Sequence, residues 1–207
     1  MAIKIALAGN PNCGKTTMFN ALTGANQYVG NWPGVTVEKK EGKLKGKRGK
    51  GEEIIVTDLP GIYSLSPYTL EEVVSRDYVL KENPDVIIDL VDATNIERNL
   101  YLTTQLIETG VPVVIALNMA DLLEKRGIKI DTKRLSMLLD CPIIETSALK
   151  GEGLDKLIDE AVTVAKKSSV DLPKDIFSKE MEEAVAEVKT VLPDSITDDK
   201  KRWYAVK

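Results

Sequence analysis

The chain has 207 residues, and its 28 Lys and Arg residues against 32 Asp and Glu residues lack the basic excess typical of nucleic-acid-binding proteins. The sequence has no histidine and two cysteines, which argues against zinc sites, histidine-based catalysis and a disulfide framework. It has no membrane-length apolar run and no room for a signal peptide before the first strand, so we expect a soluble chain.

Apolar strand patterns alternate with helical patterns along most of the chain. Strands are predicted at 2–8, 35–44, 53–57, 86–91, 113–117 and 143–146, and helices at 15–22, 70–82, 96–109, 132–139 and 154–166. The runs 86–91 and 113–117 are almost continuously apolar, as in parallel strands buried on both faces. This order predicts a doubly wound α/β fold with a mostly parallel six-stranded sheet and ligand sites at the carboxyl ends of its strands.

Two further segments are interpreted by composition. The basic, glycine-rich segment 45–51 is interpreted as an exposed hairpin connection rather than a polyanion-binding patch. Residues 166–173 are predicted to form a linker, and a helical pattern after it ends at Pro193. A last segment, with Trp203 and Tyr204, begins near Thr197. We therefore expect one domain over 1–167 and a partial, truncated all-α domain over 168–207.

The segment Gly9-Asn-Pro-Asn-Cys-Gly-Lys-Thr16 fits the phosphate-binding loop pattern G-x-x-x-x-G-K-[ST]. It lies between a predicted strand and a predicted helix, which is the context the motif needs. Its glycines let backbone N–H groups surround a phosphate, and the helix N-terminus adds a positive dipole end. Lys15 is expected to reach the β- and γ-phosphates, and Thr16 to hold Mg²⁺. The alternative is a glycine turn that only starts a helix.

Two later loops fit the switch regions of a nucleotide-dependent protein. Asp58 follows a predicted strand, where its carboxylate can hold Mg²⁺ through water, and the Gly61 N–H can meet the γ-phosphate. Thr36 lies in a glycine-flanked loop that can close over the γ-phosphate, complete the Mg²⁺ shell and open when that phosphate leaves. The switch loops are thus expected at 25–37 and 58–68.

The segments Asn118-Met119-Ala120-Asp121 and Ser147-Ala148-Leu149 predict recognition of the base. The Asp121 carboxylate can accept hydrogen bonds from N1–H and the 2-amino group of guanine, a donor pair that adenine lacks. The Ala148 backbone N–H is expected to meet guanine O6. These segments favour GTP and GDP over ATP, with an Asn/Asp helix cap as the alternative for the first of them.

The spacing and order of these elements match a Ras-like P-loop G domain. The sequences of 9–16, 30–38, 58–64 and 91–102 together closely resemble FeoB, the ferrous iron transport protein B family, strongly over 1–167 and weakly beyond. The resemblance implies a GTPase domain at the cytoplasmic face of the bacterial inner membrane, followed by the start of a helical, nucleotide-dissociation-inhibiting domain. It also implies a membrane portion of the same chain, oligomers through that portion, and small accessory proteins of iron transport as partners.

Two positions depart from the commoner Ras-like pattern. Ile62 stands where a water-orienting glutamine is usual, and Met119 replaces the lysine of N-K-x-D, so we expect weak nucleotide holding and fast release. In FeoB-like and related potassium-activated GTPases, an asparagine at the position of Asn12 helps to hold a monovalent cation, which implies K⁺ here. The alternative is that Asn12 only stabilises the loop turn. Arg76 and Arg98 are candidate arginine fingers, although surface helix charges are the favoured interpretation.

The prediction assigns catalysis to Asn12, Lys15, Thr36 and Gly61. Mg²⁺ is assigned to Thr16, Thr36 and Asp58, and K⁺ to Asn12. The nucleotide-binding residues are Gly9, Asn10, Pro11, Asn12, Cys13, Gly14, Lys15, Thr16, Thr17, Gly34, Val35, Thr36, Asp58, Leu59, Pro60, Gly61, Asn118, Met119, Asp121, Ser147, Ala148 and Leu149. Two other functions stay open: a nucleotide-gated binding switch with incidental hydrolysis, and a K⁺-dependent GTPase of RNA modification or ribosome assembly.

Overall fold

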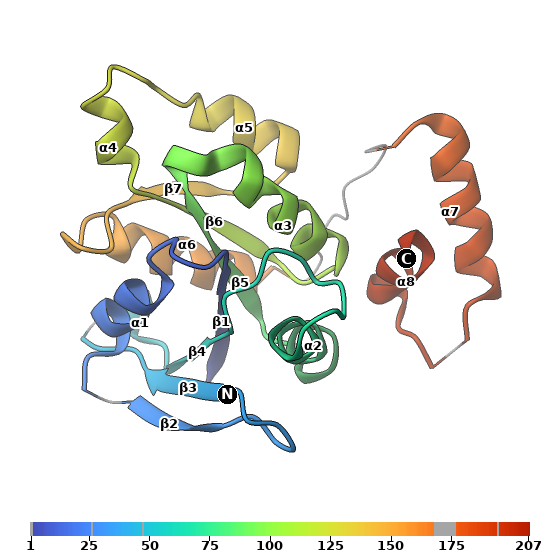
Figure 1. The fold of residues 1–207 in the computed structure, drawn as a ribbon, viewed down its shortest axis with the longest axis horizontal. Coiled ribbons are helices and arrows are strands. Elements are labelled where there is room, and N and C mark those ends of the chain that lie inside the picture. The colour runs from blue at the N-terminus through green and yellow to red at the C-terminus, as the bar shows by residue number, and fades with distance from the viewer. Residues whose placement is uncertain (1, 26, 47, 168–176, 194) are drawn as a thin grey trace.

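The computed structural model describes residues 2–25, 27–46, 48–167, 177–193 and 195–207 (Figure 1). Its centre is a seven-stranded sheet in the order β2-β3-β4-β1-β5-β6-β7. The strands are β1 (Ile3–Gly9), β2 (Gln27–Asn31), β3 (Glu38–Lys43), β4 (Ile54–Asp58), β5 (Val86–Asp92), β6 (Val113–Asn118) and β7 (Ile143–Thr146). From β4 to β7 the neighbours are parallel, whereas β3 is antiparallel to both β2 and β4. The mostly parallel α/β fold is confirmed, but the predicted number of six strands is wrong.

The additional strand, β2, lies inside the predicted switch loop 25–37. Its backbone pairs with β3, from Gln27 opposite Gly42 to Asn31 opposite Glu38. Tyr28 and Val29 are 69% and 53% exposed, so β2 is an edge strand without a core-facing side. A strand that buries no alternate residues leaves no period-2 pattern in the sequence, which is why it was missed.

The helices of the α/β part are α1 (Lys15–Thr23), α2 (Leu70–Asp77), α3 (Ile96–Glu108), α4 (Ala120–Glu124), α5 (Thr132–Leu139) and α6 (Leu154–Ala165). The short α4 was not predicted. The helix predicted at 70–82 is α-helical only to Asp77 and continues as a π-helical turn over Tyr78–Glu82. A capping box, in which the Thr69 and Glu72 side chains each bind the other's backbone N–H, fixes the start of α2.

The sheet separates two apolar clusters of the core. On β5, Ile88 and Leu90 belong to the cluster under α1 and α6, whereas Ile87 and Val91 belong to the cluster under α2 and α3. Alternate residues of a strand point to opposite faces, so a strand covered on both sides is apolar throughout. This arrangement confirms the reason for which β5 and β6 were predicted as buried parallel strands.

Two helices, α7 (Lys179–Val191) and α8 (Asp198–Val206), pack on each other beside the α/β part (Figure 1). Trp203 of α8 is 4% exposed and belongs to the core cluster under α2 and α3. The predicted linker lies largely outside the described residues, and the domain boundary at 167 stays a prediction. Among the described residues, no helix has the length and apolar character that crossing a membrane requires.

Candidate nucleotide site

The segment 9–16 joins β1 to α1 and borders a cavity of about 600 Å³ at the carboxyl edge of the sheet. Its lining residues come from three of the predicted motifs: Asn10, Pro11, Asn12, Gly14, Lys15, Thr16, Thr17, Gly61 and Met119. The fold therefore brings the phosphate loop together with the Gly61 segment and the residue after β6, as expected for a ligand site at the ends of parallel strands.

Backbone geometry explains the residue types of the loop. Gly14 has φ 94°, and a Cβ there would lie 2.5 Å from Asn118 Nδ2. A Cβ on Gly9 would lie 2.7 Å from the Leu90 carbonyl oxygen. Both positions thus need glycine. Asn12 adopts a left-handed conformation with φ 67°, which asparagine tolerates better than most residues, and its exposed side chain lines the cavity.

Lys15 and Asp58 form an ion pair beside the cavity. The Lys15 Nζ lies 2.5 Å from Asp58 Oδ1, and Asp58 is 7% exposed. Burial raises the pKa of Asp58, and the charge of Lys15 opposes that shift. The pair arises because β1 and β4 are parallel neighbours with Leu7 opposite Asp58, so their ends meet. Carboxylate oxygen and the exposed Thr16 hydroxyl are hard donors of the kind that Mg²⁺ prefers.

The Gly61 segment lies directly on the phosphate loop. The Ile62 N–H donates to the Gly9 carbonyl over 3.3 Å, and a Cβ on Gly61 would lie 3.2 Å from the Cα of Pro11. The Ile62 side chain is 3% exposed and belongs to the core cluster under α2 and α3. It therefore offers nothing to the cavity. Leu59 and Cys13 are equally buried, so only their backbones are available to a ligand there.

Thr36, by contrast, lies outside the lining of the cavity. Together with Gly34 and Val35 it belongs to the connection between β2 and β3. Trp32 anchors this connection: it is 7% exposed, and its ring lies 5.3 Å from that of Tyr78 at 72°. The backbone N–H of Trp32 also donates to the Val37 carbonyl over 2.9 Å. The structure thus holds the predicted Mg²⁺ ligand in a folded turn outside the lining of the cavity.

The base-recognition segments meet at Asn118. Its Nδ2 donates to the Cys13 carbonyl over 2.9 Å, and its Oδ1 accepts from the Ala148 N–H over 3.0 Å. The N–H that was expected to meet guanine O6 is thus donated to Asn118. Leu149 is 89% exposed and Ser147 is 7% exposed.

The Asp121 carboxylate has a partner that the sequence reasoning missed. Lys150 Nζ lies 2.8 Å from Asp121 Oδ2, and this hydrogen bond lowers the pKa of Asp121. The signal was present, because Lys150 immediately follows the predicted Ser147-Ala-Leu segment.

Neither candidate arginine finger lines the cavity. Arg76 pairs with Asp77 over 3.3 Å, and the Arg98 guanidinium lies 4.1 Å from the centre of the Tyr63 ring. In this structure both side chains therefore make contacts within the protein.

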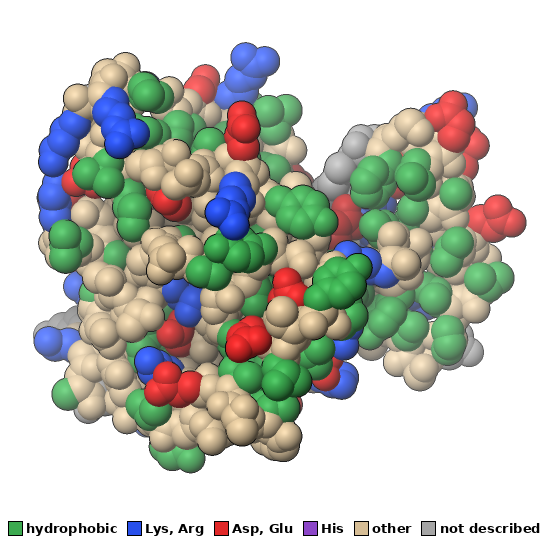
Figure 2. All heavy atoms as spheres, viewed as in Figure 1, with side chains coloured by type: hydrophobic (Ala, Val, Ile, Leu, Met, Phe, Trp, Pro, Cys, Tyr) green, Lys and Arg blue, Asp and Glu red, His purple; other side chains and the backbone are tan. Residues whose placement is uncertain are grey.

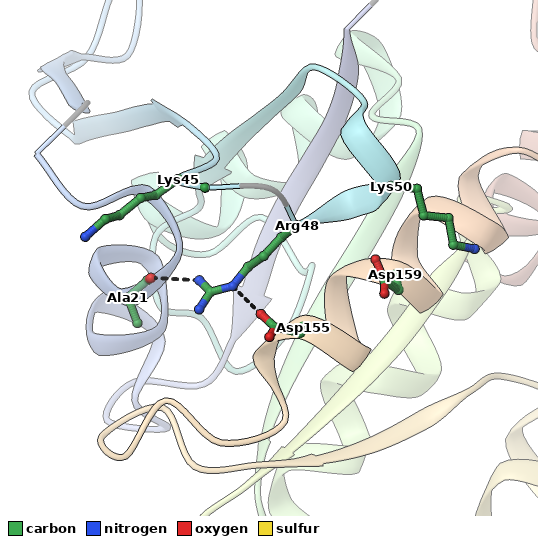
Figure 3. A pocket seen from close by; sticks show the side chains of 7 residues that line it. Ala21, Lys45, Arg48, Lys50, Asp155 and Asp159 are labelled. Atoms are coloured by element: carbon green, nitrogen blue, oxygen red, sulfur yellow. Dashed lines mark hydrogen bonds and ion pairs between the residues drawn. The ribbon is translucent and has the colours of Figure 1, made fainter.

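A second cavity, of about 640 Å³, lies between α1, α6 and the connection from β3 to β4 (Figure 3). Arg48 donates to the Ala21 carbonyl over 3.3 Å and pairs with Asp155, and Lys50 donates to Thr163 over 2.9 Å. The basic segment 45–51 is thus a hairpin connection, as predicted, with its described Arg48 and Lys50 tied to neighbouring helices. On the face drawn in Figure 2, basic side chains likewise lie among acidic ones.

Comparison with known proteins identifies relatives of this chain, and the matched region includes the residues of the site. The family model for ferrous iron transport protein B matches residues 3–161. An Fe(2+) transport protein A/Fe(2+) transporter FeoB fusion protein of Porphyromonas gingivalis is 50% identical over 163 residues, which are 78% of this chain and 19% of that protein. The Fe(2+) transporter FeoB of Shigella flexneri is 40% identical over 208 residues, which are 99% of this chain and 26% of that protein. The chain thus spans about a fifth to a quarter of these relatives' length.

Solved structures agree with this result. A point mutant of the S. thermophilus NFeoB bound to mGDP has a TM-score of 0.93 and 50% identity, covering 100% of this chain and 78% of that chain. The cytosolic domain of the T. maritima FeoB iron transporter in its apo form has a TM-score of 0.90 and 40% identity, covering 100% and 81%. The chain therefore belongs to the ferrous iron transport protein B family, of which it represents the N-terminal, Ras-like G domain.

Proposed function

We propose that this chain binds GTP and GDP and hydrolyses GTP, as the regulatory G domain of a ferrous iron transporter. The observation that carries the proposal is the convergence of Lys15, Thr16 and Gly61 on one cavity, with Asp58 paired to Lys15 at its side. Solved relatives bound to mGDP or GDP support a guanine nucleotide as the ligand. Residues 1–167 form the G domain in this proposal, and 168–207 the start of a helical domain.

Lys15 and Asp58 change partners when a nucleotide is bound. Lys15 is the residue that reaches the β- and γ-phosphates, because it follows the loop at the start of α1. Asp58, freed from Lys15, would hold Mg²⁺ through water, and the hydroxyls of Thr16 and Thr36 would bind it directly. Mg²⁺ supplies charge neutralisation at the β–γ bridge. Thr36 reaches it only after the connection between β2 and β3 moves from the position described above.

Asn12 is the residue assigned to K⁺. Its amide oxygen is an uncharged oxygen ligand for a cation, on an exposed side chain that lines the phosphate end of the cavity. Ile62 is buried and orients no water, so charge at the phosphates is the remaining means of stabilising the transition state. Backbone carbonyls of residues 30–34 complete the proposed cation site after the loop moves.

The guanine base is assigned to Asp121, whose carboxylate exchanges Lys150 for the N1–H and 2-amino group. Asp121→Asn inverts one hydrogen-bonding group and should shift the preference from guanine to xanthine nucleotides. Competition binding of GTP, XTP and ATP measures this shift, and Lys150→Ala is the matched control that retains the carboxylate. An unchanged preference for GTP in Asp121→Asn removes Asp121 from the base site.

A nucleotide-gated switch with incidental hydrolysis is the second candidate, and the burial of Ile62 favours it. The partners in either case are the membrane portion of the longer relatives, oligomers formed through it, and small accessory proteins of iron transport. We place the domain at the cytoplasmic face of the bacterial inner membrane. A GTPase of RNA modification or ribosome assembly is disfavoured by the acidic balance of the chain.

Phosphate release from GTP and ATP, with Mg²⁺ and in KCl or NaCl of equal ionic strength, tests the proposal. We expect release from GTP alone, faster in KCl, and none from Lys15→Ala. GDP binding without phosphate release supports the switch. A chain that binds no guanine nucleotide contradicts both.

A further inference from the structure

The segment 92–99, between β5 and the first turn of α3, lies outside the lining of the nucleotide cavity, and the proposed function gives it no role. Its side chains are cross-linked by hydrogen bonds. Asp92 accepts from the Thr94 N–H over 2.8 Å and from the Asn95 side chain over 2.9 Å. Asn99 accepts from the Asp92 N–H over 3.2 Å and donates to the Asn95 carbonyl over 2.9 Å. This bonding fixes the start of α3 relative to the end of β5.

The phosphate loop contacts this hydrogen-bonded segment through Asn10. Asn10 is 3% exposed, and its Nδ2 donates to the Arg98 carbonyl over 3.5 Å. A hydrogen bond of that length is weak, so the contact is mainly packing. The Oδ1 of Asn10 is buried without a hydrogen-bond partner among the described residues.

The loop between β4 and α2 contacts α3 at two points. The Arg98 guanidinium lies 4.1 Å from the centre of the Tyr63 ring, which is 42% exposed. Gln105, seven residues further along α3 and therefore on the same face, accepts from the Leu65 N–H over 2.7 Å. In the sequence, Gly61 comes just before Tyr63 and Leu65, the two residues of this loop that contact α3. On its other side it meets Pro11 of the phosphate loop.

We propose that Arg98 is a positioning residue that holds the Gly61 segment against the phosphate loop, by stacking on Tyr63 while its own backbone contacts Asn10. This inference rests on the proposed function, in which the Gly61 N–H meets the γ-phosphate. Because the Arg98 guanidinium lies over the Tyr63 ring, Arg98 does not act as an arginine finger in this proposal. A planar guanidinium covers an aromatic face in a way that a lysine ammonium does not.

The test measures GTP hydrolysis and the affinities for GDP and a non-hydrolysable GTP analogue in the whole 207-residue chain. Arg98→Ala and Tyr63→Leu should each lower kcat and analogue affinity by about two- to fivefold, the size of one exposed cation–π contact. GDP affinity should stay unchanged, because GDP lacks the phosphate that Gly61 meets. Tyr63→Phe keeps the aromatic face and should behave as the wild type, and Arg98→Lys should not. Arg134→Ala, on α5, is the matched control.

The double variant Arg98→Ala with Tyr63→Leu should be no worse than either single variant, because both remove the same contact. Additive losses overturn the proposal, as does an Arg98→Ala protein that matches Arg134→Ala. A normal rate in Tyr63→Leu beside a large loss in Arg98→Ala also overturns it, since an arginine finger needs no Tyr63. Equal loss of GDP and analogue affinity shows a merely structural role. If the wild-type chain binds no guanine nucleotide, the proposed function itself is wrong, which is a different outcome from those above.

Discussion

The carboxyl group of Asp89 lies in the middle of the sheet with no cation beside it among the described residues. It is 1% exposed, and the Thr103 hydroxyl, 2.5 Å away, donates to it. Burial raises its pKa to about 7, and the Thr103 hydrogen bond opposes that shift. The folded chain therefore keeps this proton at pH values where the unfolded chain has lost it.

This difference makes folding depend on pH in a definite direction. As the pH rises from about 4 to about 7, this group should lower the free energy of unfolding by up to about 1.4 kcal/mol per pH unit. The reason is that the folded state binds one more proton than the unfolded state in this range. Asp89→Asn mimics the protonated form, so it should remove that slope and raise stability at pH 7 and above. Urea denaturation of both proteins at pH 5, 6, 7 and 8 measures the difference. Parallel stability curves would mean that Asp89 is ionised in the folded state across this range.

Asn12 is the second residue whose side chain decides a measurable property. If it holds K⁺ against the phosphates, its loss removes one preorganised charge contact, which typically costs about 2.7–4 kcal/mol or a hundred- to thousandfold in rate. Asn12→Ala should therefore abolish the stimulation of GTP hydrolysis by KCl over NaCl while nucleotide binding persists. Steady-state phosphate release in the two salts tests it. Equal wild-type rates in both salts, or a potassium response that survives in the variant, contradicts the assignment.

At the scale of elements, the sequence predicted best where burial dictates the pattern. β5 and β6 are apolar on both faces, and the phosphate loop needs glycine at Gly9 and Gly14, so these features were predictable. β2 was not, because its stability comes from backbone pairing with β3 and its own side chains are exposed. The five residues of α4 likewise carry too short a pattern. Nor does the sequence show that Thr36 lies outside the lining of the cavity, because that depends on the packing of Trp32 against Tyr78.

The connection between β2 and β3 should move when the γ-phosphate is present. Its anchor, Trp32, is 7% exposed and its indole N–H has no hydrogen-bond partner in the described part of the chain, which makes release from the core less costly. In a Trp203→Phe background, Trp32 fluorescence should be quenched more by acrylamide with a GTP analogue than with GDP. Thr36→Ala should abolish this difference and weaken the analogue but not GDP. If GDP and analogue affinities fall equally, Thr36 does not sense the γ-phosphate.

At the scale of the whole molecule, the C-terminal helices are joined to the α/β part by a buried charge cluster. Arg202 of α8 donates to Glu108 of α3 over 2.7 Å and to Glu182 of α7 over 2.8 Å. The hydrogen bond to Glu182 is the main reason that the pKa of Arg202 is raised, and burial opposes it. Helical spacing predicted α7, and a further segment was expected from near Thr197, but this link was not predicted, because the sequence does not show that residues 94 positions apart meet.

Removing Arg202 should loosen this attachment. Arg202→Ala leaves the buried carboxylate of Glu108 and the partly buried carboxylate of Glu182 without their shared cation, and breaking a fully buried pair typically costs about 3–5 kcal/mol. The loss should fall on the docking of α7 and α8, because the cluster under α1 and α6 contains no residue of these helices and the cluster under α2 and α3 contains only Trp203 from them. In a Trp32→Phe background, Trp203 should become accessible to acrylamide while the main thermal transition moves little. Lys179→Ala, which removes an exposed pair on α7, is the control and should leave Trp203 protected. A Trp203 that stays equally protected in Arg202→Ala would show that its own packing, rather than the charge cluster, holds the helices in place.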